Sequence, residues 1–268
     1  MNADPEVRGI PGAGVGGIAV SASLFLGIPS PDLGTLATLA GFDSVILDCE
    51  HGFPLDSTVR SMILAVKSRG GQCIVRIAKD AVGQVGALAD VGLDGILLAG
   101  PEHLDEMSAV VGLAAFPGHG TRSVNPFVPA AVIPGDVGRL QDSAKSFELW
   151  AMAEHPSFLA ELDECSVSGG AVAGWTGIII GPYDLAAALG CDPDPADAVL
   201  LDAVLRFSQA ARRLGIKCGL FARDGDTLRR WRALGIQPDL AVMGYDRDVW
   251  FQECRRRVDQ AGGRGRRE

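Results

Sequence analysis

The segment Ala40–Gly52, AGFDSVILDCEHG, contains the pattern that decides the fold. Its first four residues are typical of a helix that ends at a glycine and turns into a strand. The run Ser44–Leu47 is short and apolar, as in strands that are buried on both faces. Polar residues follow it directly, in the order DCEH. The same helix ending recurs as VGLD at Val91–Asp94 and, more loosely, as LGIQPD at Leu234–Asp239.

Outward from this segment, short apolar runs alternate with amphipathic stretches along the whole chain. The predicted strands are Gly17–Ser23, Ser44–Leu47, Gln72–Ile77, Gly95–Ala99, Glu148–Ala153, Gly177–Ile180, Lys217–Phe221 and Leu240–Met243. The predicted helices are Pro31–Leu39, Leu55–Ser68, Ala81–Val91, Glu102–Ala115, Ser157–Asp163, Pro195–Leu214, Thr227–Leu234 and Arg247–Asp259. Strand followed by helix, eight times over, predicts an α/β protein with a closed (β/α)8 TIM barrel. A doubly wound open sheet is the alternative.

The length of 268 residues suits one such barrel, which commonly needs about 250 residues. We therefore predict a single barrel domain over 17–260, a flexible segment at 1–16 and a flexible basic tail at 261–268. The stretch Phe116–Phe147 is rich in proline and glycine and interrupts the rhythm between the fourth and fifth strands. A connection of this length is usually functional, so it predicts an active-site loop.

Composition excludes several classes of function. A formal net charge of −9 argues against a nucleic-acid partner. No apolar run approaches the roughly 18 residues of a membrane span, and the start of the chain lacks the apolar core of a signal peptide. The six cysteines have no CxxC spacing, which favours a cytoplasmic protein. The GxGxxG pattern at Gly12–Gly17 precedes the first strand, whereas a dinucleotide site would follow one.

Two carboxylates are expected to lie side by side at the carboxyl ends of the strands, where barrels of this kind carry their chemistry. Glu154 follows the fifth predicted strand and Asp184 the sixth. Neighbouring carboxylates repel each other unless a cation or a proton lies between them. Oxygen ligands without cysteine favour Mg²⁺ or Mn²⁺. The alternative is that each acid simply caps the helix that follows it.

Three further residues lie near the same strand ends. Arg76 interrupts an apolar strand and needs an anion, either the enolate of a substrate or a structural partner, Asp48 or Glu50. His51 follows the second strand and could act as general acid or base. Cys49 alternates with Asp48 and is expected to face the helix layer, so thiol chemistry is disfavoured.

These segments resemble the HpcH/HpaI aldolase family, the class II pyruvate aldolases related to the citrate lyase β subunit. The resemblance covers about residues 21 to 244. It is carried by IPSPDLGTLATLAGFDSVILDCEHG (Ile28–Gly52), IVRI (Ile74–Ile77), PGHGTRS (Pro117–Ser123), Glu154, GIIIGPYDL (Gly177–Leu185) and CGLFARD (Cys218–Asp224). It implies a divalent-metal-dependent carbon–carbon lyase acting on a pyruvate-like 2-oxo acid and an aldehyde.

By the same resemblance, Glu154 and Asp184 are the metal ligands, His51 is the acid/base and Arg76 stabilises the enolate. Arg76, Tyr183 and Asp184 are expected to contact the substrate. Asp90 resembles an acid that raises the basicity of the histidine. It ends a helix at the bottom of its own barrel, so it could reach His51 only from a neighbouring subunit.

The resemblance therefore implies a homo-oligomer, usually a hexamer, with shared active sites. Two residues depart from the pattern of the family at positions expected to bear on the substrate. Met152 stands where many relatives have glutamine, and Tyr183 stands where they have a small residue. A citrate-synthase-like Claisen condensation and a barrel that binds a metabolite without turnover are the alternatives.

Overall fold

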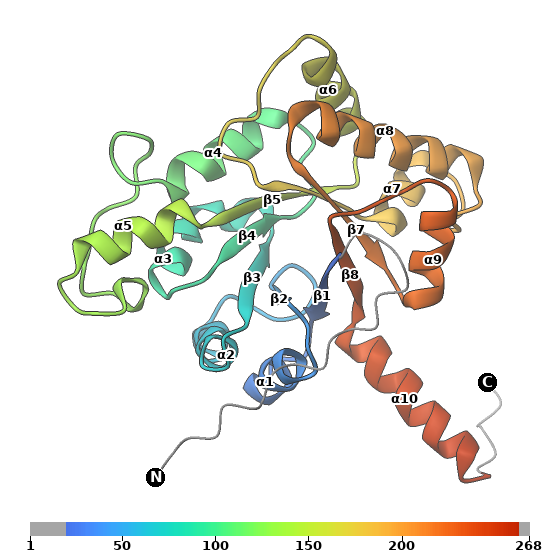
Figure 1. Ribbon diagram of the computed structural model, residues 1–268, viewed down its shortest axis with the longest axis horizontal. Helices are drawn as coiled ribbons and strands as arrows, with labels where there is room; N and C mark the ends of the chain where they lie inside the picture. The colour runs from blue at the N-terminus through green and yellow to red at the C-terminus, as the bar shows by residue number, and fades with distance from the viewer. Residues whose placement is uncertain (1–19, 263–268) are drawn as a thin grey trace.

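The strands form a closed parallel barrel in the order β1 to β8, as the sequence predicts (Figure 1). This computed structural model describes residues 20–262. The strands are β1 (Ser21–Leu26), β2 (Ser44–Asp48), β3 (Gln72–Ile77), β4 (Gly95–Leu98), β5 (Glu148–Ala153), β6 (Gly177–Ile180), β7 (Lys217–Ala222) and β8 (Leu240–Tyr245). The open-sheet alternative is therefore wrong. Within the described part of the chain, no helix is long and apolar enough to cross a membrane.

Helices surround this barrel and connect successive strands (Figure 1). They are α1 (Pro31–Leu39), α2 (Ser57–Lys67), α3 (Val85–Asp90), α4 (Leu104–Ala114), α5 (Val137–Lys145), α6 (Pro156–Val167), α7 (Pro182–Leu189), α8 (Ala198–Leu214), α9 (Gly225–Ala233) and α10 (Asp246–Gln260), with the 3-10 turns η1 (Lys79–Gln84) and η2 (Pro129–Ala131). The last helix, α10, projects away from the barrel (red in Figure 1).

Alternation along the strands divides the core into two layers, because successive side chains point to opposite faces of a strand. The barrel interior is filled by Phe25, Ile46, Ile74, Leu97, Trp150, Met152, Ile179, Leu240 and Val242. The other strand positions, such as Leu47 and Ile77, pack against the helices. Counting on by two from Ile46 and Ile74 places Asp48 and Arg76 at the inner mouth, where their Cα atoms are paired in register.

The three recurring segments, each running from a glycine to an aspartate, have the same structural role. The glycines that end the helices, Gly41, Gly92 and Gly235, have φ between 94° and 100°, a region that favours glycine. The aspartates that follow, Asp43, Asp94 and Asp239, each accept a 2.8 Å hydrogen bond from the backbone N–H of Ala22, Cys73 and Cys218 respectively. Each aspartate thus fixes its own strand against the preceding one at the bottom of the barrel.

The structure differs from the predicted elements at both ends of the chain and at two helices. β1 begins at Ser21 and extends to Leu26, and residues 17–19 of the predicted strand lie outside the described range. So do the predicted segment 1–16 and residues 263–268 of the predicted tail. The sequence reading missed α5 and α7 altogether. Both are short, with nine residues in α5 and eight in α7, so neither offers a long amphipathic pattern.

The stretch Phe116–Phe147 does not line the opening at the top of its own barrel, so the expectation of an active-site loop is wrong within this chain. It contains η2 and α5, which bury Ala130, Ala131 and Leu140 in a small core of their own. In Figure 1, α5 lies beside α3. With the loop before β4, the stretch encloses a cavity of about 350 Å³. Asp94 lines this cavity, so the stretch lies toward the bottom of the barrel. The apolar residues of the stretch explain why it folds onto the barrel, because burial against another surface removes them from water.

Candidate active site

The ends of five successive strands, β2 to β6, bring their polar residues to one opening at the top of the barrel. The opening is a cavity of about 650 Å³. It is lined by Glu50, His51, Ala78, Lys79, Asp80, Ala99, Gly100, Glu102, Glu154, His155 and Asp184. The lining is dominated by acids, which makes this opening a suitable place for a cation. Phe116–Phe147 contributes no residue to it.

Glu154 lies in an environment that disfavours its charged form. Its side chain is buried, and Oε2 has no hydrogen-bond partner among the described residues. Burial, followed by the nearby charges of Asp184 and Glu50, raises the pKa of Glu154 to about 8. A buried carboxylate oxygen without a partner is costly. A cation bound here would supply the missing partner and offset the repulsion among the acids.

Neither carboxylate caps a helix, so the capping alternative is wrong. The N-cap of α6 is His155 and that of α7 is Gly181, and no side chain accepts a capping bond at either. Asp184 lies in the first turn of α7 with its side chain exposed. Over residues 20–262, no group of three or more His, Cys, Asp and Glu side chains forms a metal cage. A cation held by the pair would keep coordination positions open for substrate and water.

Arg76 has a structural partner, as one of the two interpretations holds. Its Nε and Nη2 each donate to one carboxylate oxygen of Asp48 at 2.8 Å, and its Nη1 lies 3.2 Å from Glu50 Oε2. Burial alone would raise the pKa of Asp48, but hydrogen bonding and the charge of Arg76 hold it below its usual value. The guanidinium also lies 4.8 Å from the centre of the Phe25 ring. It is thereby fixed at the inner mouth, next to Glu154.

His51 lies at the entrance with 69% of its side chain exposed. Its Nε2 is 3.6 Å from Glu50 Oε2, and its backbone N–H donates to Asp48 Oδ1 at 3.3 Å. The turn after β2 therefore holds the backbone while the imidazole faces the opening. A proton carrier at such a site must be within reach of both water and substrate.

The thiol of Cys49 faces the helix layer, as predicted, and packs against the outer core. Burial, with the nearby charges of Asp48 and Asp56, raises its pKa to about 12. A thiol that stays protonated is a poor nucleophile. The position of Cys49 in the outer core and its raised pKa both disfavour thiol chemistry at this site.

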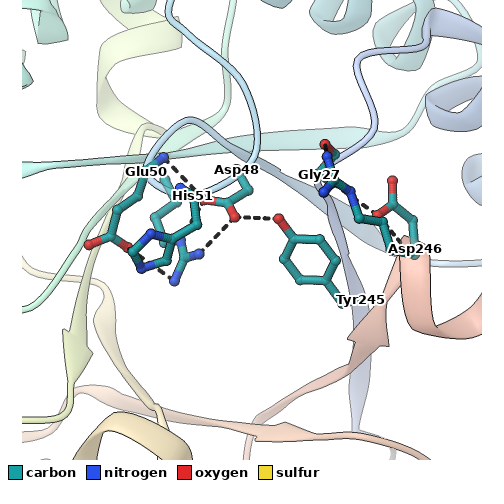
Figure 2. A network of polar contacts seen from close by, with 8 residues as sticks. Gly27, Asp48, Glu50, His51, Tyr245 and Asp246 are labelled. Carbon is teal, nitrogen blue, oxygen red and sulfur yellow. Dashed lines mark hydrogen bonds and ion pairs between the residues drawn. The ribbon is translucent and has the colours of Figure 1, made fainter. Parts of the chain in front are cut away.

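Sequence reasoning missed the residues that β1, β7 and β8 contribute to the same mouth. Tyr245, the last residue of β8, donates its hydroxyl to Asp48 Oδ2, and Figure 2 shows the ring aimed at that carboxylate. Phe25 of β1 stacks on the Tyr245 ring, and Phe221 of β7 lies beside Phe25. Strand alternation was the available signal for Phe25 and Phe221. It was not one for Tyr245, because β8 faces inward at Leu240 and Val242 and a register shift against β1, between Ser23 and Phe25, comes before the pairing of Phe25 with Tyr245.

A second contact fixes the loop after β1. The carboxylate of Asp246 accepts hydrogen bonds from the backbone N–H groups of Gly27 at 3.1 Å and Ile28 at 2.9 Å (Figure 2). Arg247 Nη2 donates to the Gly27 carbonyl at 3.1 Å. The loop after β1 is thus tied to the start of α10, which keeps Tyr245 in place over the barrel.

Asp90 ends α3, and its carboxylate is already paired within the chain. Arg122 Nη2 and Nε donate to its Oδ1 at 2.7 and 3.2 Å. The Arg122 side chain is 3% exposed, so the pair is largely buried on the arginine side. Contact between Asp90 and His51 of a neighbouring subunit remains a prediction.

Comparison with known proteins gives concordant results. The family model described as HpcH/HpaI aldolase/citrate lyase matches residues 21–247. A hydroxypyruvate/pyruvate aldolase from Pseudomonas aeruginosa is 28% identical over 234 residues, which cover 87% of this chain and 85% of that enzyme. The crystal structure of an HpcH/HpaI aldolase/citrate lyase family protein from Burkholderia cenocepacia has a TM-score of 0.80 at 24% identity, covering 91% of this chain and 95% of that chain.

The crystal structure of the citrate synthase SbnG has a TM-score of 0.77 at 20% identity, with 91% and 93% of the two chains covered. At such identities the structural likeness shows the barrel fold alone. The family model, by contrast, matches the sequence from the start of β1 to the first turn of α10. The family match and the aldolase names of the relatives confirm the expectation of an aldolase-type lyase. The chain belongs to the HpcH/HpaI aldolase/citrate lyase family.

Proposed function

We propose that this protein is a divalent-metal-dependent aldolase that forms or breaks a carbon–carbon bond next to a pyruvate-type 2-oxo acid. The observation that carries the proposal is the pair formed by Glu154 and Asp184. One of these acids is buried with an unpartnered oxygen and a pKa of about 8, and the other is exposed nearby. The printed name of the relative from Pseudomonas aeruginosa, a hydroxypyruvate/pyruvate aldolase, supports the same substrate class.

The proposed metal ligands are Glu154 and Asp184, and their oxygen atoms favour Mg²⁺ or Mn²⁺. When bound, such an ion supplies Lewis-acid polarisation of the keto group of the 2-oxo acid. Arg76 would face the enolate oxygen that develops as the bond between C3 and C4 breaks. Its fixed geometry suits this role, because a donor that is already oriented does not need to reorganise during the reaction.

In the cleavage direction, His51 would accept the proton of the C4 hydroxyl, directly or through water. The electrons of the O–H bond then form the new carbonyl of the aldehyde. The electrons of the C3–C4 bond pass to the enolate, and protonation at C3 completes the 2-oxo acid. In the direction of synthesis, His51 returns its proton to the new alkoxide. Tyr183, at the start of α7, and Asp184 would contact the substrate from the opposite side of the opening.

We further propose a homo-oligomer, a hexamer by resemblance, in which Asp90 approaches His51 of a neighbouring subunit. Exposed apolar side chains on α10, including Trp250 and Phe251, are compatible with burial between subunits. A cytoplasmic location is supported by six free cysteines.

The direct test of the proposed function needs no second substrate. Purified protein is incubated with pyruvate in D₂O, and exchange of the methyl protons is followed by NMR. We expect exchange with Mg²⁺ or Mn²⁺, its loss in EDTA and its return when metal is restored. Undiminished exchange in EDTA, with no metal found by elemental analysis, would overturn the proposal.

Arg76→Lys is expected to lower kcat for pyruvate exchange by about 10²-fold, the scale of one preorganised donor. Lysine keeps the charge but lacks the planar fork that grips Asp48 with two hydrogen bonds. The measurement is the exchange rate over a range of pyruvate concentrations, which separates kcat from KM. A change confined to KM would show that Arg76 only holds the ground state.

A further inference from the structure

Tyr245 reaches the mouth of the barrel through an irregularity of β8. Val242 faces the barrel interior, so alternation alone would turn the side chain at position 245 outward. Val242 pairs with Ser23 of β1, and the next pair joins Tyr245 to a β1 residue only two positions further along. β8 thus contains one extra residue, as in a β-bulge, and Gly244 lies within it with a φ of 88°, a region that favours glycine. Bulges next to active sites re-aim side chains, and this one turns Tyr245 toward the mouth.

The loop after β1 is shaped to admit the Tyr245 side chain. A Cβ at position 27 would lie 2.5 Å from Cζ of the Tyr245 ring and closer still to the hydroxyl oxygen. The φ of Gly27 is not positive, so glycine is required here by the close approach of the ring and not by the backbone conformation. The N–H of Gly27 donates to Asp246 at 3.1 Å. The loop is therefore tied to the residue that directly follows Tyr245, which holds the ring in place.

The hydroxyl of Tyr245 donates to the carboxylate that holds Arg76 (Figure 2). Asp48 is fully buried, and each of its oxygens accepts one hydrogen bond from the guanidinium at 2.8 Å. The backbone N–H groups of Glu50 and His51 donate to Oδ1 at 3.1 and 3.3 Å, whereas the tyrosine hydroxyl donates to Oδ2. Without that hydroxyl, Oδ2 would keep a single donor among the described residues. The carboxylate, and the guanidinium paired with it, would then be free to tilt.

The ring of Tyr245 supports the same arginine by a second route. It is stacked on the ring of Phe25, with the ring centres 5.9 Å apart and the planes at 24°. The guanidinium carbon of Arg76 lies 4.8 Å from the centre of the Phe25 ring, as in a cation–π contact. Burial, followed by the hydrogen bond to Asp48, raises the pKa of the Tyr245 hydroxyl, so it remains a donor at neutral pH.

We propose that Tyr245 is a positioning residue that holds the Arg76 guanidinium in the orientation in which it stabilises the enolate. Tyr245 acts on Arg76 through Asp48 and Phe25. The inference rests on the proposed function, in which Arg76 faces the developing enolate oxygen. The negative charge on that oxygen is present in the enolate and absent from ground-state pyruvate. A tilted guanidinium therefore weakens binding of the enolate more than binding of pyruvate.

The test compares pyruvate with oxalate, a planar dianion that resembles the pyruvate enolate in size and charge. The full-length protein is used with Mn²⁺, and oxalate is tested as an inhibitor of pyruvate proton exchange. For Tyr245→Phe we expect the Ki of oxalate to rise about tenfold and kcat to fall by a similar factor, since a hydrogen bond to a charged group is lost. The KM for pyruvate should change by less than about twofold. Gly27→Ala should give the same pattern, because its Cβ displaces the tyrosine hydroxyl from Asp48.

Ser44→Ala is the matched control. Ser44 lies on β2, as Asp48 does, but at the opposite end of the strand. Its hydroxyl is buried and donates to Ser23 Oγ at 3.0 Å. This variant also loses one buried hydroxyl group, so it should lower the Tm. It should leave kcat and the Ki of oxalate unchanged, because it lies outside the mouth of the barrel.

The outcomes separate the inference from the proposed function. An unchanged Ki for oxalate in Tyr245→Phe, with exchange intact, would overturn the inference and leave the proposed function standing. A lower Tm alone, as expected for Ser44→Ala, would mean that Tyr245 only stabilises the fold, which also overturns it. So would equal rises in the Ki of oxalate and the KM of pyruvate, because Tyr245 would then act on the ground state. Absence of exchange in the parent protein with both Mg²⁺ and Mn²⁺ would overturn the proposed function, and the inference with it.

Discussion

Glu154→Gln is expected to lower kcat/KM by about 10³-fold or more while the protein remains folded. The amide removes the charged ligand, and a bound cation contributes several kcal/mol of charge stabilisation to reactions of this type. The same change should weaken Mn²⁺ binding, measured by titration followed by electron paramagnetic resonance. In EDTA, the Tm of the variant should not fall below that of the parent protein. The replaced carboxylate is buried and repelled by Asp184 and Glu50, which is why its pKa is raised to about 8.

The matched control is Glu161→Gln. Glu161 lies on α6, a few residues after Glu154, but its side chain is 40% exposed and pairs with His103 on the outer surface. This variant should keep the metal affinity and activity of the parent protein. If Glu154→Gln bound Mn²⁺ as tightly as the parent protein and remained active, Glu154 would not be a metal ligand. A variant that lost activity but also failed to fold would be recognised by its Tm.

Most of the barrel could be predicted from the sequence, because buried parallel strands appear as short apolar runs with glycine and aspartate at fixed places. The segment AGFDSVILDCEHG contains all of these signals, and the structure gives each a physical role. Gly41 adopts a positive φ, and Asp43 accepts a hydrogen bond from the backbone N–H of Ala22. The strand that follows, Ser44–Asp48, is buried along its whole length. The helices α5 and α7 were missed because neither has a long amphipathic pattern.

The candidate site was only partly predictable from the sequence. Residues that follow neighbouring strands could be predicted to lie together, whereas contacts between distant strands could not. Glu154 and Asp184 follow adjacent strands, so their proximity required nothing beyond the order of the strands. The contact between Tyr245 and Asp48 joins residues 197 positions apart and depends on closure of the barrel between β8 and β1. The ring contacts that join Phe221, Phe25 and Tyr245 likewise need β1, β7 and β8 to meet. Helix ends and the acids that follow the strands can be predicted from local sequence, whereas an aromatic cluster built from distant strands is a property of the closed barrel.

Asp48→Ala is expected to destabilise the folded protein by about 3–5 kcal/mol, the scale for a buried ion pair that loses one partner. Asp48 is fully buried, and it accepts two hydrogen bonds from Arg76 and one from Tyr245. Chemical denaturation at pH 7 gives the free energy of unfolding. The effect should shrink in acid. Because the folded pKa of Asp48 lies below its ordinary value of 3.8, its contribution is present above that pH and is lost as the pH falls through the folded pKa.

A surface pair of the same chemistry provides the control. Asp163 accepts two hydrogen bonds from Arg206, whose side chain is 47% exposed, so Asp163→Ala should cost no more than about 1 kcal/mol. The double variant Asp48→Leu/Arg76→Met should recover much of the stability lost in Asp48→Ala, because it removes both buried charges together, although its activity should be absent. Equal losses for Asp48→Ala and Asp163→Ala would mean that Glu50 alone suffices to hold Arg76. Asp48 would then have no special role in fixing the guanidinium at the mouth of the barrel.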